Sequence, residues 1–162
     1  EPDKRCPASQ PLDVQVALET LLAVGAAAPK VVAGACDFLA GVAAPDGPVP
    51  VLLPSIAGYP RAEHWAATDH YPPDINPTAA IVGCARALGA DHPWLDRAET
   101  WCFATLEDDG PPAEAHALLC AARFLEHAGW VEAGANATSR DDRAGYWEGY
   151  LEDLVSVLDE AD

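Results

Sequence analysis

Basic side chains are scarce in this sequence. Lysine and arginine together number 9, against 26 aspartate and glutamate residues, so the formal net charge is -17. A surface of that sign repels phosphate backbones and anionic membrane faces. The composition therefore predicts that nucleic acid is not a partner.

Long hydrophobic runs and methionine are absent. No apolar run approaches the roughly 20 residues that a membrane-spanning helix needs. The opening segment, EPDKRCPASQ, has no hydrophobic core of a secretory signal. We therefore expect a soluble, cytoplasmic protein without a membrane span. Because even an initiator methionine is missing, we also expect a processed or partial chain.

Paired cysteines are absent as well. The five cysteines stand singly along the sequence and form no C-x-x-C pair, which argues against a disulfide framework. Four of them fall among Ala, Val and Leu in predicted helices, where a free thiol behaves as a small buried hydrophobe. The sequence also lacks G-x-S-x-G, Walker, G-x-G-x-x-G and H-E-x-x-H motifs. We therefore expect packing cysteines, no metal site and no cofactor.

Helical periodicity dominates what is present. With 162 residues, 50% hydrophobic and 22% charged, the chain suits one globular domain spanning 1–162. Apolar residues recur at spacings of three and four, while no segment alternates with a period of two. The sequence predicts helices over 12–24, 29–42, 77–88, 93–106, 113–127 and 143–160. The expected fold class is all-α.

The buried faces and ends of these helices can also be predicted. For the first helix the expected buried stripe is Val14, Ala17, Leu18, Leu21 and Leu22. Asn76 before Pro77 is predicted to cap the third helix, and Asp109-Gly110 to end the fourth. Between the second and third helices, residues 45–75 form a long proline-rich loop. Loops of this length are usually either functional or disordered. The apolar side chains of this one predict that it is ordered.

A repeat links the two halves of the helical region. Residues 21–47 resemble residues 85–110 at an offset of about 64. The matched positions are Gly25 with Gly89, Pro29 with Pro93, and Asp46-Gly47 with Asp109-Gly110. The segment PTAAIVGCARAL likewise resembles AEAHALLCAARFL. Each unit is predicted to be one antiparallel α-hairpin of a stacked or circular array.

The same residues resemble a known superfamily. The pattern F-L-x-x-V-x-x-P-D-G, at residues 38–47, is similar to the repeat of the squalene cyclase and protein prenyltransferase superfamily. There a helix ends in an x-D-G turn and the hairpins close into an α/α toroid. VLLPSIAGYPRAEHW, NPTAAI and GADHPWLDRAETWC look like segments of actinobacterial prenyltransferase-like or terpene-cyclase-like proteins. The resemblance covers about residues 12–130 and implies a partial toroid of about three hairpins.

The acidic motifs of that superfamily are incomplete here. A class II cyclase protonates its substrate with the middle Asp of D-x-D-D, but this chain has Leu106 ahead of Glu107, Asp108 and Asp109. Class I chemistry needs D-D-x-x-D to hold magnesium, which Asp141-Asp142-Arg143 does not supply. The resemblance thus implies a protein that binds an apolar isoprenoid-like ligand or a protein partner. The alternative is an active prenyltransferase or terpene cyclase using magnesium and loop carboxylates, with Asp69 and Asp74 as candidates.

The candidate ligand site lies on the proline-rich loop. The loop contains five residues with aromatic or imidazole rings that lie close together in the sequence: Tyr59, His64, Trp65, His70 and Tyr71. In a toroid such loops line one mouth of the central cavity, where aromatic rings bind an apolar chain or stabilise a cation. The alternative is that Tyr59 and Trp65 anchor the loop while the histidines face water.

Aromatic residues also gather on the last predicted helix, 143–160. Tyr146, Trp147 and Tyr150 fall within five residues of one another. They would be covered either by a second copy of the chain, giving a homodimer, or by folding back over the same chain.

Overall fold

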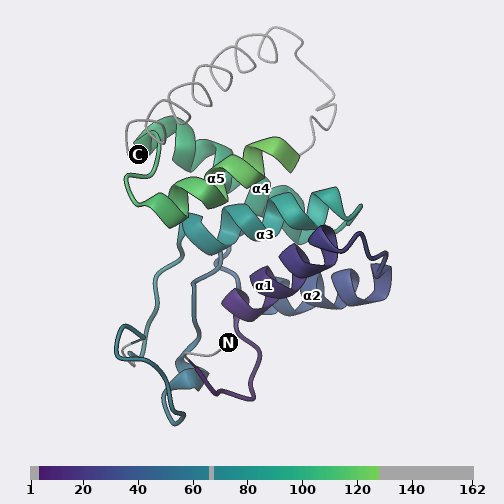
Figure 1. Cartoon of the computed structure of the whole chain (residues 1–162). Coiled ribbons are helices and arrows are strands. Elements are labelled where there is room, and N and C mark those ends of the chain that lie inside the picture. Colours follow the sequence, from purple (N-terminus) through teal and green to yellow (C-terminus); the bar gives the residue numbers. More distant parts are fainter. Residues whose placement is uncertain (1–3, 66–67, 128–162) are drawn as a thin grey trace, which may run out of the picture.

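The computed structural model describes residues 4–65 and 68–127, and the structural statements below refer to these residues (Figure 1). The helices are α1 Pro11–Ala23, α2 Pro29–Val42, α3 Ile75–Ala87, α4 Pro93–Asp109 and α5 Ala115–His127, with a short 3-10 helix η1 Pro54–Ile56. This part of the chain has no β-strand, only isolated bridges between Lys4 and Arg61 and between Pro50 and Pro73. The all-α prediction is confirmed for it. The predicted helix 143–160, with its three aromatic residues, lies outside the described residues.

Helices α1 and α3 end in the same kind of turn. Gly25 and Gly89 follow them with φ of 64° and 76°, a backbone region that glycine adopts without strain. In both turns the glycine N–H donates to the carbonyl three residues earlier, and the next N–H donates to the carbonyl five residues earlier. Pro29 and Pro93 then occupy the first position of α2 and α4. The links 24–28 and 88–92 therefore reverse the chain in matching ways.

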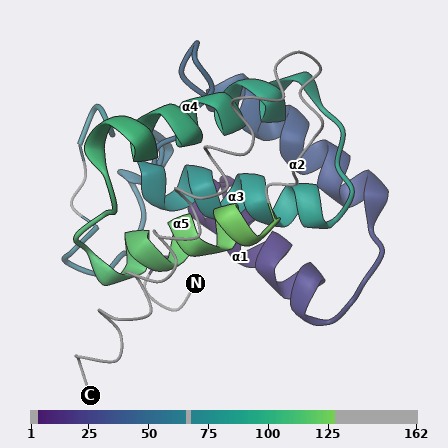
Figure 2. The same ribbon diagram turned by 90° about the horizontal axis from the view of Figure 1, so that it is seen from above.

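The helices form two layers. Helices α1, α3 and α5 make up the first layer, in which α3 contacts both of the others, and α2 and α4 make up the second (Figures 1 and 2). Contacts between α1 and α2 and between α3 and α4 join the layers. Helix α3 thus lies at the centre, packed against α1, α4 and α5.

The three helices of the first layer run parallel. Gln15 of α1 contacts Cys120 of α5, and one turn later Glu19 pairs with Arg123. Asn76 of α3 likewise contacts Cys120, while Gly83 lies against Arg123. Because the residue numbers rise together along each pair, α1, α3 and α5 share one direction.

Helix α3 is the most buried element. Its nine residues from Pro77 to Ala85 are all buried, and most of them are small. At Gly83 an added Cβ would lie 2.8 Å from the carbonyl oxygen of Arg123 and 2.9 Å from the Cα of Phe124. The missing side chain therefore sets how closely α3 and α5 approach.

The buried face predicted for α1 is partly wrong. Leu18 is buried as predicted, whereas Ala17 is exposed and Gln15 is only 2% exposed. The reason is that α5 lies against the side of α1 that carries Gln15 and Glu19. The buried face of α1 is thereby rotated away from its most apolar stripe.

Two predicted helix ends also need correction. Asp74 caps α3, not Asn76, because the Asp74 carboxylate accepts the N–H of Asn76 at 2.8 Å. Pro77 fits inside the first turn, where an N–H has no partner within the helix. Helix α4 ends before Gly110, as the Asp109-Gly110 pair predicts, but it runs to Asp109 instead of 106, so the Glu107-Asp108-Asp109 run forms its exposed last turn.

Part of the loop that joins α2 to α3 is buried. Val49, Leu52 and Ile56 are all 0% exposed and belong to the core. At its start, the Trp94 indole donates to the carbonyl of Gly47 at 2.8 Å. Gly47 has φ of 115°, and a Cβ there would lie 2.5 Å from the backbone nitrogen of Ala98. Only glycine therefore fits this turn against α4.

Candidate functional site

Two buried polar side chains tie the long loop to the helices. The hydroxyl of Thr78, on α3, accepts the N–H of Val49 at 3.0 Å and donates to the carbonyl of Asp74 at 2.7 Å. Gln10, just before α1, accepts the N–H of Leu53 at 2.7 Å and donates to the Ser55 hydroxyl at 2.9 Å. The loop is therefore fixed at the N-terminal ends of α1 and α3 (Figure 1).

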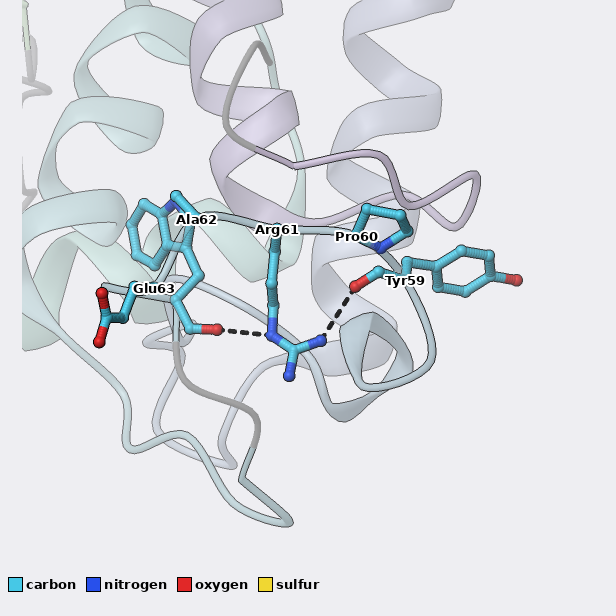
Figure 3. A pocket seen from close by; sticks show the side chains of 6 residues that line it. Tyr59, Pro60, Arg61, Ala62 and Glu63 are labelled. Atoms are coloured by element: carbon cyan, nitrogen blue, oxygen red, sulfur yellow. Dashed lines mark hydrogen bonds between the residues drawn. The ribbon is translucent and has the colours of Figure 1, made fainter.

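Arg61 holds the far part of the loop in shape. Its guanidinium donates to the backbone carbonyls of Trp65 at 2.7 Å and Tyr59 at 3.0 Å (Figure 3). It also donates to the carbonyl of Ala57 at 3.1 Å. Lys4 pairs with this residue in a backbone bridge, so the segment before α1 braces the same turn. Three backbone carbonyls of the loop are therefore held by one guanidinium group.

The Arg61 turn surrounds an open depression of about 320 Å³, lined by Tyr59, Pro60, Arg61, Ala62, Glu63 and Trp65. Tyr59 is 40% exposed, and its ring points away from the guanidinium, while Glu63 lies on the opposite side of Arg61 (Figure 3). The His64 and Trp65 rings lie 4.8 Å apart, tilted by 53°. The structure thus brings Tyr59, His64 and Trp65 into one turn.

The other candidate residues lie outside this depression. Asp69 and His70 are exposed, and the His70 N–H is held by the Thr68 hydroxyl at 3.3 Å. Tyr71 is half-buried. Asp74 is further along, with its carboxylate engaged in the α3 cap. The two candidate carboxylates, Asp69 and Asp74, are therefore in different environments.

Across 4–65 and 68–127, no three His, Cys, Asp or Glu side chains converge as a metal ion requires. Asp69 and Asp74 therefore have no third such ligand in this part of the chain. The prediction that carboxylates of the loop act with magnesium receives no support from their placement.

A second polar cluster, which the sequence did not predict, lies within the first layer. The Gln15 amide donates to Glu19 at 3.0 Å and to the Cys120 sulfur at 3.6 Å, and the Cys120 thiol donates to Asn76 at 3.3 Å. Arg123 pairs with Glu19 beside them. These side chains come from α1, α3 and α5, so their proximity depends on the fold. The available signal was Gln15 itself, a polar residue between Val14 and Val16 in the predicted helix.

The thiols of this layer stay protonated. Burial, with a further contribution from the Glu19 carboxylate, raises the pKa of Cys84 to about 11 and that of Cys120 to about 12. Both cysteines are free. At neutral pH both are therefore neutral thiols and poor nucleophiles, and the Cys120 thiol donates to Asn76.

The chain was compared with protein-family models, with curated proteins and with solved structures, and none of them matches it. The resemblance to the squalene cyclase and prenyltransferase superfamily therefore stays a prediction. No helix among the described residues is both long enough and apolar enough to cross a bilayer.

Proposed function

We propose that this chain is an α-hairpin array of the α/α-toroid type that binds an apolar, isoprenoid-like ligand and has no complete catalytic motif. In such an array one layer of parallel helices lines the ligand space and the other layer covers it from outside. We assign the first role to α1, α3 and α5 and the second to α2 and α4.

The parallel first layer is the observation that carries this proposal. Helices α1, α3 and α5 share one direction, as inner helices of successive hairpins do. The glycine turns at Gly25 and Gly89 are 64 residues apart and have the same hydrogen bonds. The spacing equals the sequence repeat, which supports an array built by duplication.

The loop supplies the entrance in this proposal. It joins the layer at the N-terminal ends of α1 and α3 (Figure 1). Arg61 fixes the backbone that carries Tyr59 and Trp65. Less conformational entropy of the loop is therefore lost when these residues bind a ligand. Rings placed this way would contact an apolar chain as it enters.

A ligand screen tests the proposal. The purified chain is titrated with farnesol, farnesyl diphosphate and squalene, and binding is followed by native mass spectrometry and thermal shift. We expect at least one of them to bind, and Trp65→Ala to weaken that binding about tenfold, which corresponds to roughly 1.4 kcal/mol. Trp101→Ala is the matched control, since Trp101 is also half-buried but lies on α4 in the second layer. Failure of all three ligands to bind refutes the proposal.

The same screen covers the enzymatic alternative. Farnesyl diphosphate with saturating magnesium is assayed for released diphosphate. Release above buffer that Asp69→Ala abolishes would establish a prenyl-transfer or cyclisation enzyme. If no diphosphate is released, the enzymatic alternative is rejected and only the binding function remains.

A protein partner is the second candidate, favoured by the exposure of Tyr59 on a locked loop. Exposed Tyr and Trp side chains often dominate the energy of protein interfaces. A photo-crosslinking residue at position 59 should capture one defined partner, whereas the same residue at exposed Val31 of α2 should not. Equal capture from both positions would reject this candidate.

A further inference from the structure

The polar cluster of the first layer leaves one strong hydrogen-bonding group unused. Gln15 is 2% exposed, and its Oε1 atom is buried with no hydrogen-bond partner among the described residues. Buried carbonyl oxygens in folded proteins almost always have a donor, either from the protein or from a bound molecule. The unpaired oxygen therefore points to something that the cluster binds.

The orientation of the Gln15 amide follows from its neighbours. Its Nε2 group donates to the Glu19 carboxylate at 3.0 Å and to the Cys120 sulfur at 3.6 Å. Turning the amide over would place its oxygen against the Glu19 carboxylate, where two acceptors repel. The free group is therefore the oxygen, and its ligand must be a donor.

The remaining members of the cluster are already engaged. The Cys120 thiol donates to Asn76 Oδ1 at 3.3 Å, and the Glu19 carboxylate is paired with Arg123. Because that ion pair balances the Glu19 carboxylate, a cationic donor would gain little from it and would face the Arg123 guanidinium. The site accordingly favours a neutral donor.

We propose that Gln15 Oε1, at the junction of α1, α3 and α5, binds the hydroxyl group of a neutral ligand. Two sources share this chemistry: the alcohol end of an isoprenoid, and a resident water molecule. The isoprenoid source rests on the proposed function and narrows it to isoprenoid alcohols, as opposed to diphosphates. The water source does not depend on that function.

Separate measurements distinguish the two sources. In the first, the full chain is titrated with farnesol, with farnesane, which lacks the hydroxyl, and with farnesyl diphosphate. Farnesol at a hundredfold excess over its Kd should raise Tm by about 5 °C or more, and farnesane should raise it less. In the second, magnetisation transfer from water to the Gln15 side-chain amide should reveal a long-lived water.

Gln15→Met tests the role of the oxygen, since methionine keeps the length of the side chain and lacks the amide acceptor. We expect it to abolish the farnesol shift. Val16→Ala, at an exposed neighbouring position of α1, should leave the shift unchanged. If Gln15→Met does not fold, the Gln15 side-chain ¹³C carbonyl resonance of the wild type should still move when farnesol is added.

The outcomes also separate this inference from the proposed function. Binding of squalene or farnesyl diphosphate, with neither a farnesol effect at Gln15 nor a bound water, overturns the inference alone. A bound water with no isoprenoid binding supports the site and refutes the proposed function. Farnesol binding that Gln15→Met leaves intact, with no bound water, also overturns the inference.

Discussion

At the scale of single residues, Asp74 is both the cap of α3 and a candidate catalytic carboxylate. Its carboxylate accepts the Asn76 N–H at 2.8 Å, and its carbonyl accepts the Thr78 hydroxyl at 2.7 Å. Asp74→Ala removes the side-chain cap of α3 and should lower the free energy of unfolding by about 1 kcal/mol. Asp69→Ala, on the exposed loop, should change it by less than about 0.5 kcal/mol. Urea unfolding measures both, and equal losses would contradict the capping role.

The five thiols should differ sharply in reactivity. Cys36, Cys84, Cys102 and Cys120 are buried, with pKa values raised by burial, whereas Cys6 is partly exposed. Since the thiolate is the reactive form, we expect Ellman's reagent at pH 8 to label one thiol of the native chain quickly and all of them in guanidinium. Cys6→Ser should remove the fast phase. Two or more fast thiols would show that the packing of the helices opens readily.

At the scale of helices, the contact between α3 and α5 depends on Gly83. Gly83→Ala places a Cβ against the backbone of α5 and should lower the free energy of unfolding by about 1–3 kcal/mol. Gly34→Ala is the matched control, because Gly34 lies inside α2 with open space where its Cβ would be. That change should raise stability by about 0.5–1 kcal/mol through helix propensity. Effects of the same sign in thermal unfolding would contradict this account.

The start of α5 should respond to pH through Glu114. The N–H groups of Ala117 and His116 donate to its carboxylate and lower the pKa of Glu114 from its ordinary value of 4.5. A lowered folded pKa means that the cap stabilises the native state above pH 4.5 and that this contribution is lost as pH falls through the folded value. Glu114→Gln should therefore be less stable than wild type at neutral pH, and the difference should shrink on acidification. Urea unfolding at pH 7 and pH 3.5 measures the difference, which would stay constant if the cap were unimportant.

Local signals in the sequence predicted most of the helices. The links 24–28 and 88–92 were predicted correctly from Gly25, Gly89, Pro29 and Pro93, because turns of this kind depend on neighbouring residues. The capping residue of α3 was mistaken because proline is tolerated at several first-turn positions, so the Asn76-Pro77 pair does not fix the register.

The Arg61 turn and the Gln15 cluster differ in how far the sequence could predict them. The Arg61 turn is built from residues a few positions apart, so its candidate aromatic residues could be found from the sequence, although the carbonyls that bind Arg61 could not. The Gln15 cluster joins residues 105 positions apart and depends on the packing of three helices. No local pattern encodes such an arrangement.

At the scale of the whole molecule, Thr78 connects the loop to the central helix. Thr78→Val keeps the shape of the side chain but leaves the buried N–H of Val49 without its acceptor. The expected loss in the free energy of unfolding is about 1–3 kcal/mol. Thr100→Val removes a comparable hydroxyl from the exposed face of α4 and should cost less than about 0.5 kcal/mol. Chemical denaturation of both variants provides the comparison, and similar losses would contradict a specific role for the loop contact.

The parallel first layer also sets the order in which the chain can fold during synthesis. Gln15 leaves the ribosome 105 residues before Cys120, its partner across the layer. At about 5–20 residues per second, α1 waits roughly 5–20 s for α5. Helices α2 and α3 emerge within that interval and both contact α1, so the side of α3 that packs against α5 is the part of the layer that stays uncovered longest. The close α3–α5 contact at Gly83 can therefore form only after the third helix of the layer has emerged.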